Sequence, residues 1–204
     1  YGTRGTGYPN IGSGEDSRWI GLCAEETLVR SGVGAWNMTN GRFQVGAPRF
    51  DDAEGLAFVH VQGWREAYGD LLPERFYDDS ALRGRQAMWS RLLSFDDVGE
   101  RARVARQGDQ IIGFALRGSA AEHLGHSAVR DDQLFALYVL ERWYGNGVGL
   151  QLLQQLLQGR PAQLWVAKDN GRARRFYEKN GFRDDGAEEV DQDLDGLVEV
   201  RMVR

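Results

Sequence analysis

The chain has 204 residues, of which 42% are hydrophobic and 27% charged, and its formal net charge is -5 at pH 7. This composition is that of one globular domain with a hydrophobic core. The negative charge argues against nucleic-acid binding, which requires a concentrated basic face. The sequence has no apolar run long enough to span a bilayer. Its single cysteine, Cys23, allows no internal disulfide. We therefore expect a cytoplasmic protein with neither nucleic acid nor a membrane as partner.

The first 41 residues differ in composition from the rest. The opening YGTRGTGYPNIGSG is rich in glycine and lacks periodicity, which predicts loop structure, and one short helix is expected around residues 25–30. Met38 stands just before the first patterned segment, so two interpretations stay open. Either the native chain starts at Met38, or residues 1–41 are an ordinary N-terminal extension of a domain formed by residues 42–204.

Beyond this segment the pattern predicts one strand and then two helices. RFQVGAPRF alternates enough to predict a strand. Asp51 and Asp52 predict the start of a helix, with Glu54 in capping-box position and Gly69 at the end. A second amphipathic helix is expected from about Leu82.

The second half of the chain predicts further strands and two helices. RARVARQGDQIIGFALRGS predicts two strands joined by a tight turn at Gly108 and Asp109, and QLFALYVL predicts a third. VGLQLLQQLLQ predicts a helix with a leucine stripe. After the strand AQLWVAK, the stretch GRARRFYEKN predicts a helix with Asn170 as N-cap and Gly181 just past its end. FRDDGAEEV and GLVEVRMVR predict two last strands, so the order indicates a mixed α/β sheet.

Three alternating glycines, Gly145, Gly147 and Gly149, precede the leucine-striped helix. The start of a helix offers unpaired N–H groups and about half a positive charge, and glycines let an anion approach the backbone. This loop therefore predicts a diphosphate site, although a ligand-free connection is the alternative. The loop has neither the G-x-G-x-x-G spacing of dinucleotide sites nor the Gly-Lys-Ser/Thr of ATP sites.

The stretch LYVLERWYGNGVGLQLL resembles the acyl-CoA motif of the GCN5-related N-acetyltransferase (GNAT) superfamily. NGRARRFYEKNGF resembles that superfamily's second signature, and DDAEGLAFVHVQGWREAYGDLLPERF is similar to its opening helices. The likeness covers about residues 42–204. One position departs from the motif, because Tyr144 stands where arginine or glutamine is usual. The resemblance implies a mostly antiparallel central sheet that is splayed at the acyl-CoA site and flanked by about four helices.

The resemblance also implies roles for particular residues. Main-chain groups of the motif strand would pair with the pantetheine arm, amides of the loop and helix start would bind the diphosphate, and Tyr177 would donate a proton to the departing thiolate. A bland alternative makes Tyr177 an ordinary residue of an amphipathic helix. The implied cofactor-binding residues are Leu137, Tyr138, Val139, Gly145, Asn146, Gly147, Val148, Gly149, Leu150 and Asn170.

The acceptor site is expected on the first helix, where aromatic and acidic side chains suit a cationic amine. Its candidate residues are His60, Trp64, Glu66 and Tyr68. For His60, a packed histidine is the alternative interpretation.

The proton acceptor is not identified by the motifs. Members of the superfamily carry a glutamate where this chain has Trp165 or Gln133. Glu66, His60 and Asp132, acting through water, are the candidates that remain.

We therefore expect an enzyme that uses acetyl-CoA, and no metal, to acetylate the primary amine of a small or medium cationic molecule. The amine attacks the thioester directly, since Cys23 lies outside the motif-bearing domain. An acetyltransferase of protein lysines or N-termini, and a non-catalytic acyl-CoA sensor, are the alternatives. A homodimer is an assembly that the resemblance leaves open. The spacing of His123 and His126 is only a weak metal signal. The acidic residues of 183–196 indicate a hydrated hairpin, and attraction of a cationic amine toward the site is the alternative.

Overall fold

The computed structural model describes residues 37–39, 43–69 and 71–204. Cys23, the helix expected around residues 25–30 and most of the segment 1–41 lie outside these residues. The helices and strands of the described part are β1 (Asn37–Thr39), β2 (Phe43–Gly46), α1 (Ala53–Tyr68), α2 (Asp79–Leu92), α3 (Val98–Arg101), β3 (Ala102–Gln107), β4 (Gln110–Ser119), β5 (Asp132–Val139), α4 (Val148–Leu157), β6 (Ala162–Ala167), α5 (Gly171–Lys179), β7 (Arg183–Asp191) and β8 (Leu197–Val203). Short 3-10 turns lie at η1 (Phe50–Asp52), η2 (Glu74–Phe76), η3 (Glu141–Trp143) and η4 (Gln192–Leu194).

In the described residues the strands form one eight-stranded sheet of order β1-β2-β3-β4-β5-β6-β8-β7. Neighbouring strands are antiparallel except for β5 and β6, which are parallel. The predicted hairpin turn is confirmed, because Gln107 pairs with Gln110 and Gly108 has a φ of 56°. β1 belongs to the segment 1–41 that the sequence set apart, and it pairs with β2.

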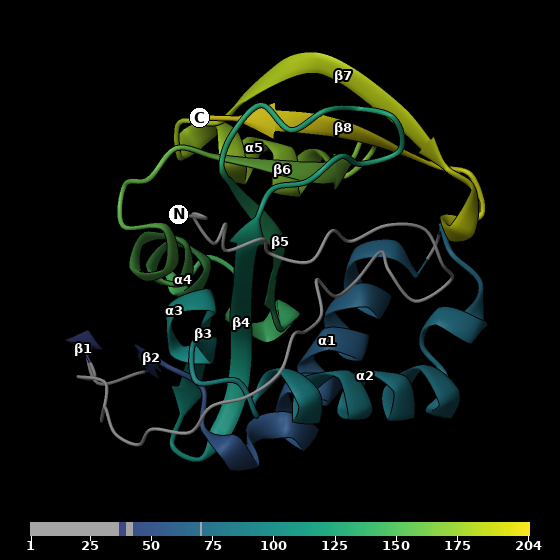
Figure 1. Ribbon diagram of the computed structural model, residues 1–204. Coiled ribbons are helices and arrows are strands. Elements are labelled where there is room, and N and C mark those ends of the chain that lie inside the picture. Colours follow the sequence, from purple (N-terminus) through teal and green to yellow (C-terminus); the bar gives the residue numbers. More distant parts are fainter. Residues whose placement is uncertain (1–36, 40–42, 70) are drawn as a thin grey trace, which may run out of the picture.

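The sheet divides where β5 meets β6. Only Asp132 and Gln133 of β5 pair with β6, opposite Ala162 and Gln163. Beyond this point the two strands diverge, and β6, β7 and β8 run across the direction of β4 in Figure 1. The expected mixed and splayed sheet is confirmed, and we call the place where the β5 and β6 backbones separate the opening.

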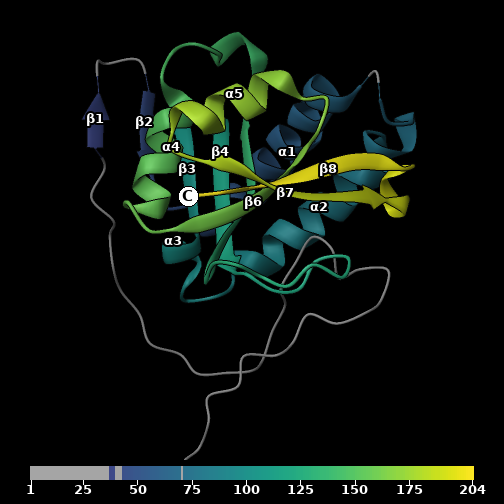
Figure 2. The same ribbon diagram turned by 90° about the horizontal axis from the view of Figure 1, so that it is seen from above.

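Helices cover both faces of the sheet. α4 packs on β2, β3, β4 and β5, whereas α1 contacts β4 and β5 with α2 behind it, so that α4 and the α1–α2 pair lie on opposite sides in Figures 1 and 2. On the α4 side four of the five leucines of the predicted stripe are buried; they are Leu152, Leu153, Leu156 and Leu157. Leu150, in the first turn, is 39% exposed, so the stripe begins one turn later than its spacing predicts. None of the helices in residues 37–39, 43–69 and 71–204 has the length and apolar character needed to cross a membrane.

Two helix starts differ from the sequence prediction. The capping box at Asp51 and Glu54 is wrong: α1 begins at Ala53 without a side-chain cap. Asp52 instead accepts a hydrogen bond from Arg49 N at 2.6 Å and pairs with the guanidinium of Arg106, both side chains being 5% exposed. A buried arginine needs a carboxylate partner, so Asp52 pairs with Arg106 on β3 instead of capping α1.

The start of α2 also differs, because the helix begins three residues before Leu82, where the sequence predicted its start. α2 begins at Asp79, because the Asp78 carboxylate accepts a hydrogen bond from Ala81 N at 2.9 Å. At the other end of the chain the predicted caps of α5 are confirmed. Asn170 Oδ1 accepts from Ala173 N at 3.0 Å, and Gly181 follows the helix with a φ of 88°.

Candidate active site

The glycine loop, residues 145–147, is exposed and leads directly into α4. Gly145 and Gly147 have φ values of 76° and 83°, which glycine adopts readily and other residues rarely do. Gly147 is the N-cap residue, no side chain caps the helix and its first turn has no acidic residue. Gln151 N donates to Gly147 O at 3.0 Å, so the amides before it have no intrahelical acceptor. These amides and the helix dipole make a site for an anion.

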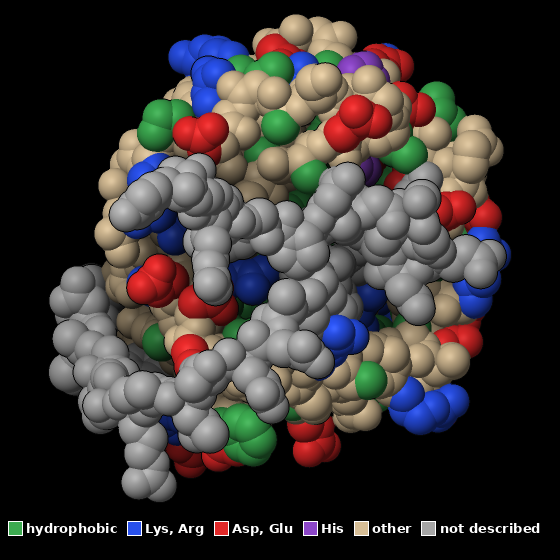
Figure 3. All heavy atoms as spheres, viewed as in Figure 1, with side chains coloured by type: hydrophobic (Ala, Val, Ile, Leu, Met, Phe, Trp, Pro, Cys, Tyr) green, Lys and Arg blue, Asp and Glu red, His purple; other side chains and the backbone are tan. Residues whose placement is uncertain are grey.

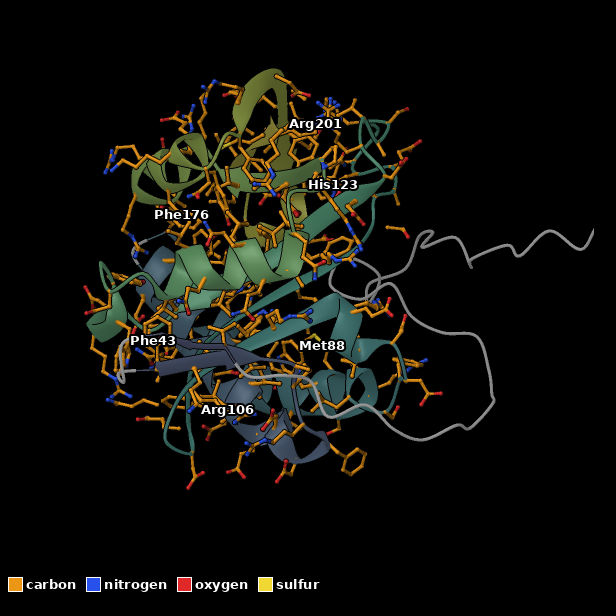
Figure 4. The ribbon with its side chains drawn as sticks, turned by 90° about the vertical axis from the view of Figure 1, so that its left-hand side faces the viewer. Phe43, Met88, Arg106, His123, Phe176 and Arg201 are labelled. Atoms are coloured by element: carbon orange, nitrogen blue, oxygen red, sulfur yellow. The ribbon has the colours of Figure 1, made fainter. Side chains whose placement is uncertain are left out.

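The helix start is held close to two other elements. A Cβ atom on Gly149 would lie 3.5 Å from the ring of Phe176 on α5 and 3.6 Å from Leu137 Cδ2 on β5. Figure 4 shows Phe176 beside α4. In contrast, a Cβ atom on Gly145 or Gly147 would meet nothing within 4 Å. The loop is therefore open on its outer side and tightly packed on the side of β5 and α5.

A cation lies beside the loop at the position where the motif departs from its usual residue. The Arg172 guanidinium on α5 is 3.7 Å from the centroid of the Tyr144 ring, a cation–π contact. Burial raises the pKa of Tyr144, and the charge and hydrogen bond of Arg172 partly offset this effect. No local pattern indicates this pairing, because the two residues come from different segments of the chain.

β5 presents different side chains to the two faces of the opening. Leu137 and Val139 pack into the core on the α4 side, and Tyr138 between them packs against the helices of the other face. Among the described residues, β5 has no ladder partner on the β6 side after Gln133. The backbone along this edge is therefore available to an extended ligand, as in strand addition.

Three tyrosines and an asparagine converge from three elements, since Asn170 is the N-cap of the helix that carries Tyr177. Tyr68 is the last residue of α1, Tyr138 lies on β5 and Tyr177 on α5. The Tyr68 hydroxyl shares hydrogen bonds with the Tyr138 hydroxyl and the Asn170 side chain. Glu199 on β8 acts electrostatically on the same hydroxyl. The structure thus brings together Tyr68, Tyr138, Asn170 and Tyr177 from the predicted set, and adds a carboxylate.

Burial keeps these phenols protonated. It raises the pKa of Tyr68 to about 12, with Glu199 adding to the effect. It also raises the pKa of Tyr177 above its ordinary value of 10.0, as does the neighbouring Tyr68. The pKa of Tyr138 is raised well above that value, first by burial and then by the other two tyrosines. All three phenols therefore remain proton donors at neutral pH.

An ion pair at the surface joins the α1–α2 connection to the β7–β8 turn. Arg75 of η2 forms an ion pair with Asp195, the residue after η4. Trp64, which is 2% exposed, shares a small core cluster with residues of both segments. The other buried members of that cluster are Leu72, Tyr77 and Leu194.

His60 lies inside an aromatic environment rather than at a surface. It is 4% exposed, stacks on Tyr138 with ring centroids 5.5 Å apart, and lies 5.2 Å from the Phe114 ring. Its Nδ1 atom has no hydrogen-bond partner in the described part of the chain. Burial, and then the charge of Arg85, hold its pKa well below 6.5. His60 is therefore neutral at physiological pH.

This lowered pKa makes stability depend on pH. His60 gains a proton more readily in the unfolded chain, so its contribution is complete above about pH 6.5 and is lost as the pH falls toward its folded-state value. In urea unfolding between pH 7 and pH 5, we expect His60→Phe to lose less free energy of unfolding than the wild type, by up to about 1.4 kcal/mol per pH unit. Parallel pH dependences of His60→Phe and the wild type would contradict this assignment.

Two of the candidate proton acceptors, Glu66 and Asp132, form contacts that link different elements of the fold. Glu66 accepts hydrogen bonds from Glu141 N at 2.8 Å and from Gln62 Nε2 at 2.9 Å, so it ties α1 to the segment after β5. Asp132 forms an ion pair with Arg117 at 2.9 Å and lies 3.9 Å from Arg160. Both carboxylates are already engaged by neighbouring groups.

The two positions of the usual glutamates have other surroundings. Gln133 accepts a buried hydrogen bond from Gln163 Nε2 at 2.9 Å. The Trp165 ring lies 4.8 Å from that of His123 and 5.3 Å from that of His126, both on the loop between β4 and β5. These histidines pair with Glu199 and Glu189 respectively. In the described ranges, no three ligand side chains gather as a metal site.

The sequence of this chain is similar to those of known N-acetyltransferases. A family model described as an acetyltransferase (GNAT) domain matches residues 99–184. Rv2775 of Mycobacterium tuberculosis, described as a probable N-acetyltransferase, is 30% identical over 152 residues, which are 66% of this chain and 76% of that protein. An uncharacterized N-acetyltransferase of Bacillus subtilis, YuaI, is 28% identical over 60% of this chain and 70% of its own length.

Solved structures share the fold. The PaiA N-acetyltransferase of Thermoplasma acidophilum, solved in complex with coenzyme A, superposes with a TM-score of 0.58 at 19% identity, over 79% of this chain and 98% of that one. A histone acetyltransferase HPA2 and related acetyltransferase of Corynebacterium glutamicum gives 0.59 at 20% identity, over 79% and 95%. The chain belongs to the GNAT family of N-acetyltransferases, and it is an acyltransferase enzyme.

Proposed function

We propose that the protein transfers an acetyl group from acetyl-CoA directly to the primary amine of a small or medium cationic molecule. The observation that carries this proposal is the position of the uncapped α4 start beside the opening between β5 and β6. A diphosphate on those amides leaves the rest of the coenzyme to extend along the free edge of β5. The thioester then reaches the tyrosines that converge at the other side of the opening.

Coenzyme binding uses the predicted residues in two ways. Amides from Gly145 to Leu150 bind the diphosphate, with Arg172 on Tyr144 adding the positive charge that the motif position lacks. Main-chain groups of Leu137 and Val139 pair with the pantetheine arm. A free amide on this edge also polarises the thioester carbonyl, where negative charge develops during the reaction.

Tyr177 is the proposed general acid. The neutral amine nitrogen attacks the acetyl carbonyl, so a C–N bond forms and the C–S bond then breaks. The phenol gives its proton to the departing sulfur and regains one from solvent. Its raised pKa keeps the phenol protonated through the pH range in which the amine becomes nucleophilic. Asn170 positions this end of the site through its hydrogen bond to Tyr68.

A small acceptor is favoured over a peptide by the contact between the α1–α2 connection and the β7–β8 turn. Arg75 and Asp195 link the α1–α2 connection to the β7–β8 turn, and the cluster around Trp64 lies beneath this link. An extended peptide needs a groove that is open at both ends, and this contact closes one side. Tyr68 is only partly buried, so its aromatic face suits a cation, whereas Trp64 is 2% exposed and already has the Arg85 guanidinium 5.1 Å from its ring centroid.

The test combines binding with turnover. Calorimetry should detect coenzyme A binding, and acetyl-CoA should release free thiol with small aliphatic di- and polyamines faster than with peptides bearing a free lysine or N-terminus. Faster release with peptides would favour the protein-acetyltransferase alternative. Coenzyme binding without amine-dependent thiol release would favour the sensor alternative, and no binding by folded protein would overturn the proposal.

A further inference from the structure

The strand β8 carries a carboxylate on the face that looks toward α1. Leu197 packs against the cluster that includes Tyr68 and Tyr138. Side chains two residues apart on a strand share a face, so Glu199 projects on the same side as Leu197. Glu199 is paired with Ala167 of β6, whose carbonyl accepts from Asn170 N at 3.0 Å. Its carboxylate therefore lies beside the opening and close to the cap of α5.

The surroundings of Glu199 connect it to both the tyrosines and the surface. Its side chain is 14% exposed, and its Oε2 atom lies 3.6 Å from His123 Nε2. On the other side it acts on the Tyr68 hydroxyl. Figure 3 shows histidine side chains beside acidic ones over β7, β8 and the β4–β5 loop, and Figure 4 shows His123 and Arg201 together at this end of the molecule. Glu199 is thus a nearly buried carboxylate with an imidazole between it and solvent.

The other candidate proton acceptors either hold structural contacts or lack the charge needed to bind an ammonium group. Glu66 and Asp132 hold framework contacts, and His60 is kept neutral inside an aromatic cluster. Glu189 lies opposite Glu199 on β7, one strand farther from the opening. Among the described residues, Glu199 is the carboxylate whose charge acts on the Tyr68 hydroxyl.

We propose that Glu199 binds the acceptor's ammonium group and takes its first proton, and that His123 positions this carboxylate and passes the proton to solvent. This inference rests on the proposed function and specifies the substrate as a cationic primary amine. The ammonium gives one proton to Glu199, and the neutral nitrogen then forms the C–N bond. The nitrogen of the adduct loses its second proton to water, and the thiolate receives its proton from Tyr177.

The charged groups around Glu199 set the direction of the pH effect. These groups are His123 on the β4–β5 loop, Glu189 on β7 and Arg201 on β8, and the neutral phenol of Tyr68 on α1 faces the same carboxylate. An amine in water has a pKa near 10, so at pH 7 only about one molecule in a thousand is free base. A carboxylate at the site removes this dependence on bulk pH. Without it, the rate should rise about tenfold per pH unit until the amine itself is neutral.

The experiment compares Glu199→Gln with Glu189→Gln, which removes the opposite carboxylate from the adjacent strand and serves as the matched control. Thiol release is followed from pH 7 to pH 9 with the panel amine that reacts fastest. We expect Glu199→Gln to lower kcat/KM at pH 7 by about 100-fold or more, with recovery as the pH rises. Its coenzyme A affinity should stay within about threefold of the wild type, and the control should keep both its rate and its pH profile.

His123→Gln tests the positioning role through the same pH profile, and should lower the rate near pH 7 while leaving coenzyme A affinity unchanged. If Glu199→Gln does not fold, Glu199→Asp keeps the charge but withdraws it by one methylene, and a rate loss of about tenfold is expected. A Glu199 variant that retains the rate and pH profile of the control overturns the inference. Failure of the wild type to release thiol with any amine would instead overturn the proposed function.

Discussion

Replacement of Gly147 by valine should lower coenzyme A affinity by at least about 100-fold in calorimetry. Gly147 has a φ of 83°, and a branched residue in this conformation is strained. The valine side chain would also stand at the cap position, where the amides of the α4 start must meet the diphosphate. Loss of one close charge-assisted contact and displacement of others accounts for about 2.7 kcal/mol, the free energy of a 100-fold change.

The same helix supplies the control for strain alone. Gly159, just past the C-terminal end of α4, has a φ of 80°, and a Cβ atom there would also meet nothing within 4 Å. Gly159→Val should therefore lower stability by a similar amount while leaving coenzyme affinity within about twofold. Equal affinities in the two variants would show that the α4 start is not the diphosphate site.

Tyr177→Phe should lower kcat by about 100-fold or more, with little change in coenzyme A affinity. A positioned general acid contributes about 10² to 10⁴ in rate, and phenylalanine removes the proton while keeping the ring. The ring lies 5.3 Å from that of Phe176 and 5.6 Å from that of Phe182, so its packing is retained. Stopped-time thiol assays and calorimetry on the same preparation separate the two effects.

Tyr77→Phe is the corresponding control in the neighbouring cluster. Its hydroxyl donates to Tyr68 O at 2.8 Å, so removing it should reduce the free energy of unfolding by about 1 kcal/mol and leave turnover within a few-fold. If Tyr177→Phe weakens coenzyme binding as much as it slows turnover, its role is structural rather than that of an acid.

Local signals predicted the helices and turns around the glycine loop. The glycine loop, the leucine stripe of α4 and the Asn170 cap all depend on residues within one or two helical turns. Such short-range patterns are set by backbone hydrogen bonding and helical periodicity, which a sequence shows directly. The family resemblance then supplied the splay between β5 and β6, which no local pattern carries.

The acceptor half depends on contacts that are distant along the chain. The charge of Glu199 acts on Tyr68 because β8 lies between β6 and β7, an order that the sequence does not display. The same limitation explains the error at the start of α1, where Asp52 pairs with Arg106, 54 residues away. Nothing local distinguishes Glu199 from the other acidic residues near the C-terminus.

The short junction between β5 and β6 also has a mechanical meaning. Two residue pairs join the β1–β5 part of the sheet to the β6–β8 part, so there the sheet is weakly cross-linked by its own backbone. A molecule bound along the free edge of β5 would link the two parts of the sheet, and its binding free energy would add to the stability of the folded protein. A ligand at 100 times its dissociation constant adds about 2.7 kcal/mol to the stability of the native state. Supply of the coenzyme would then govern how long the folded enzyme persists as well as how fast it works.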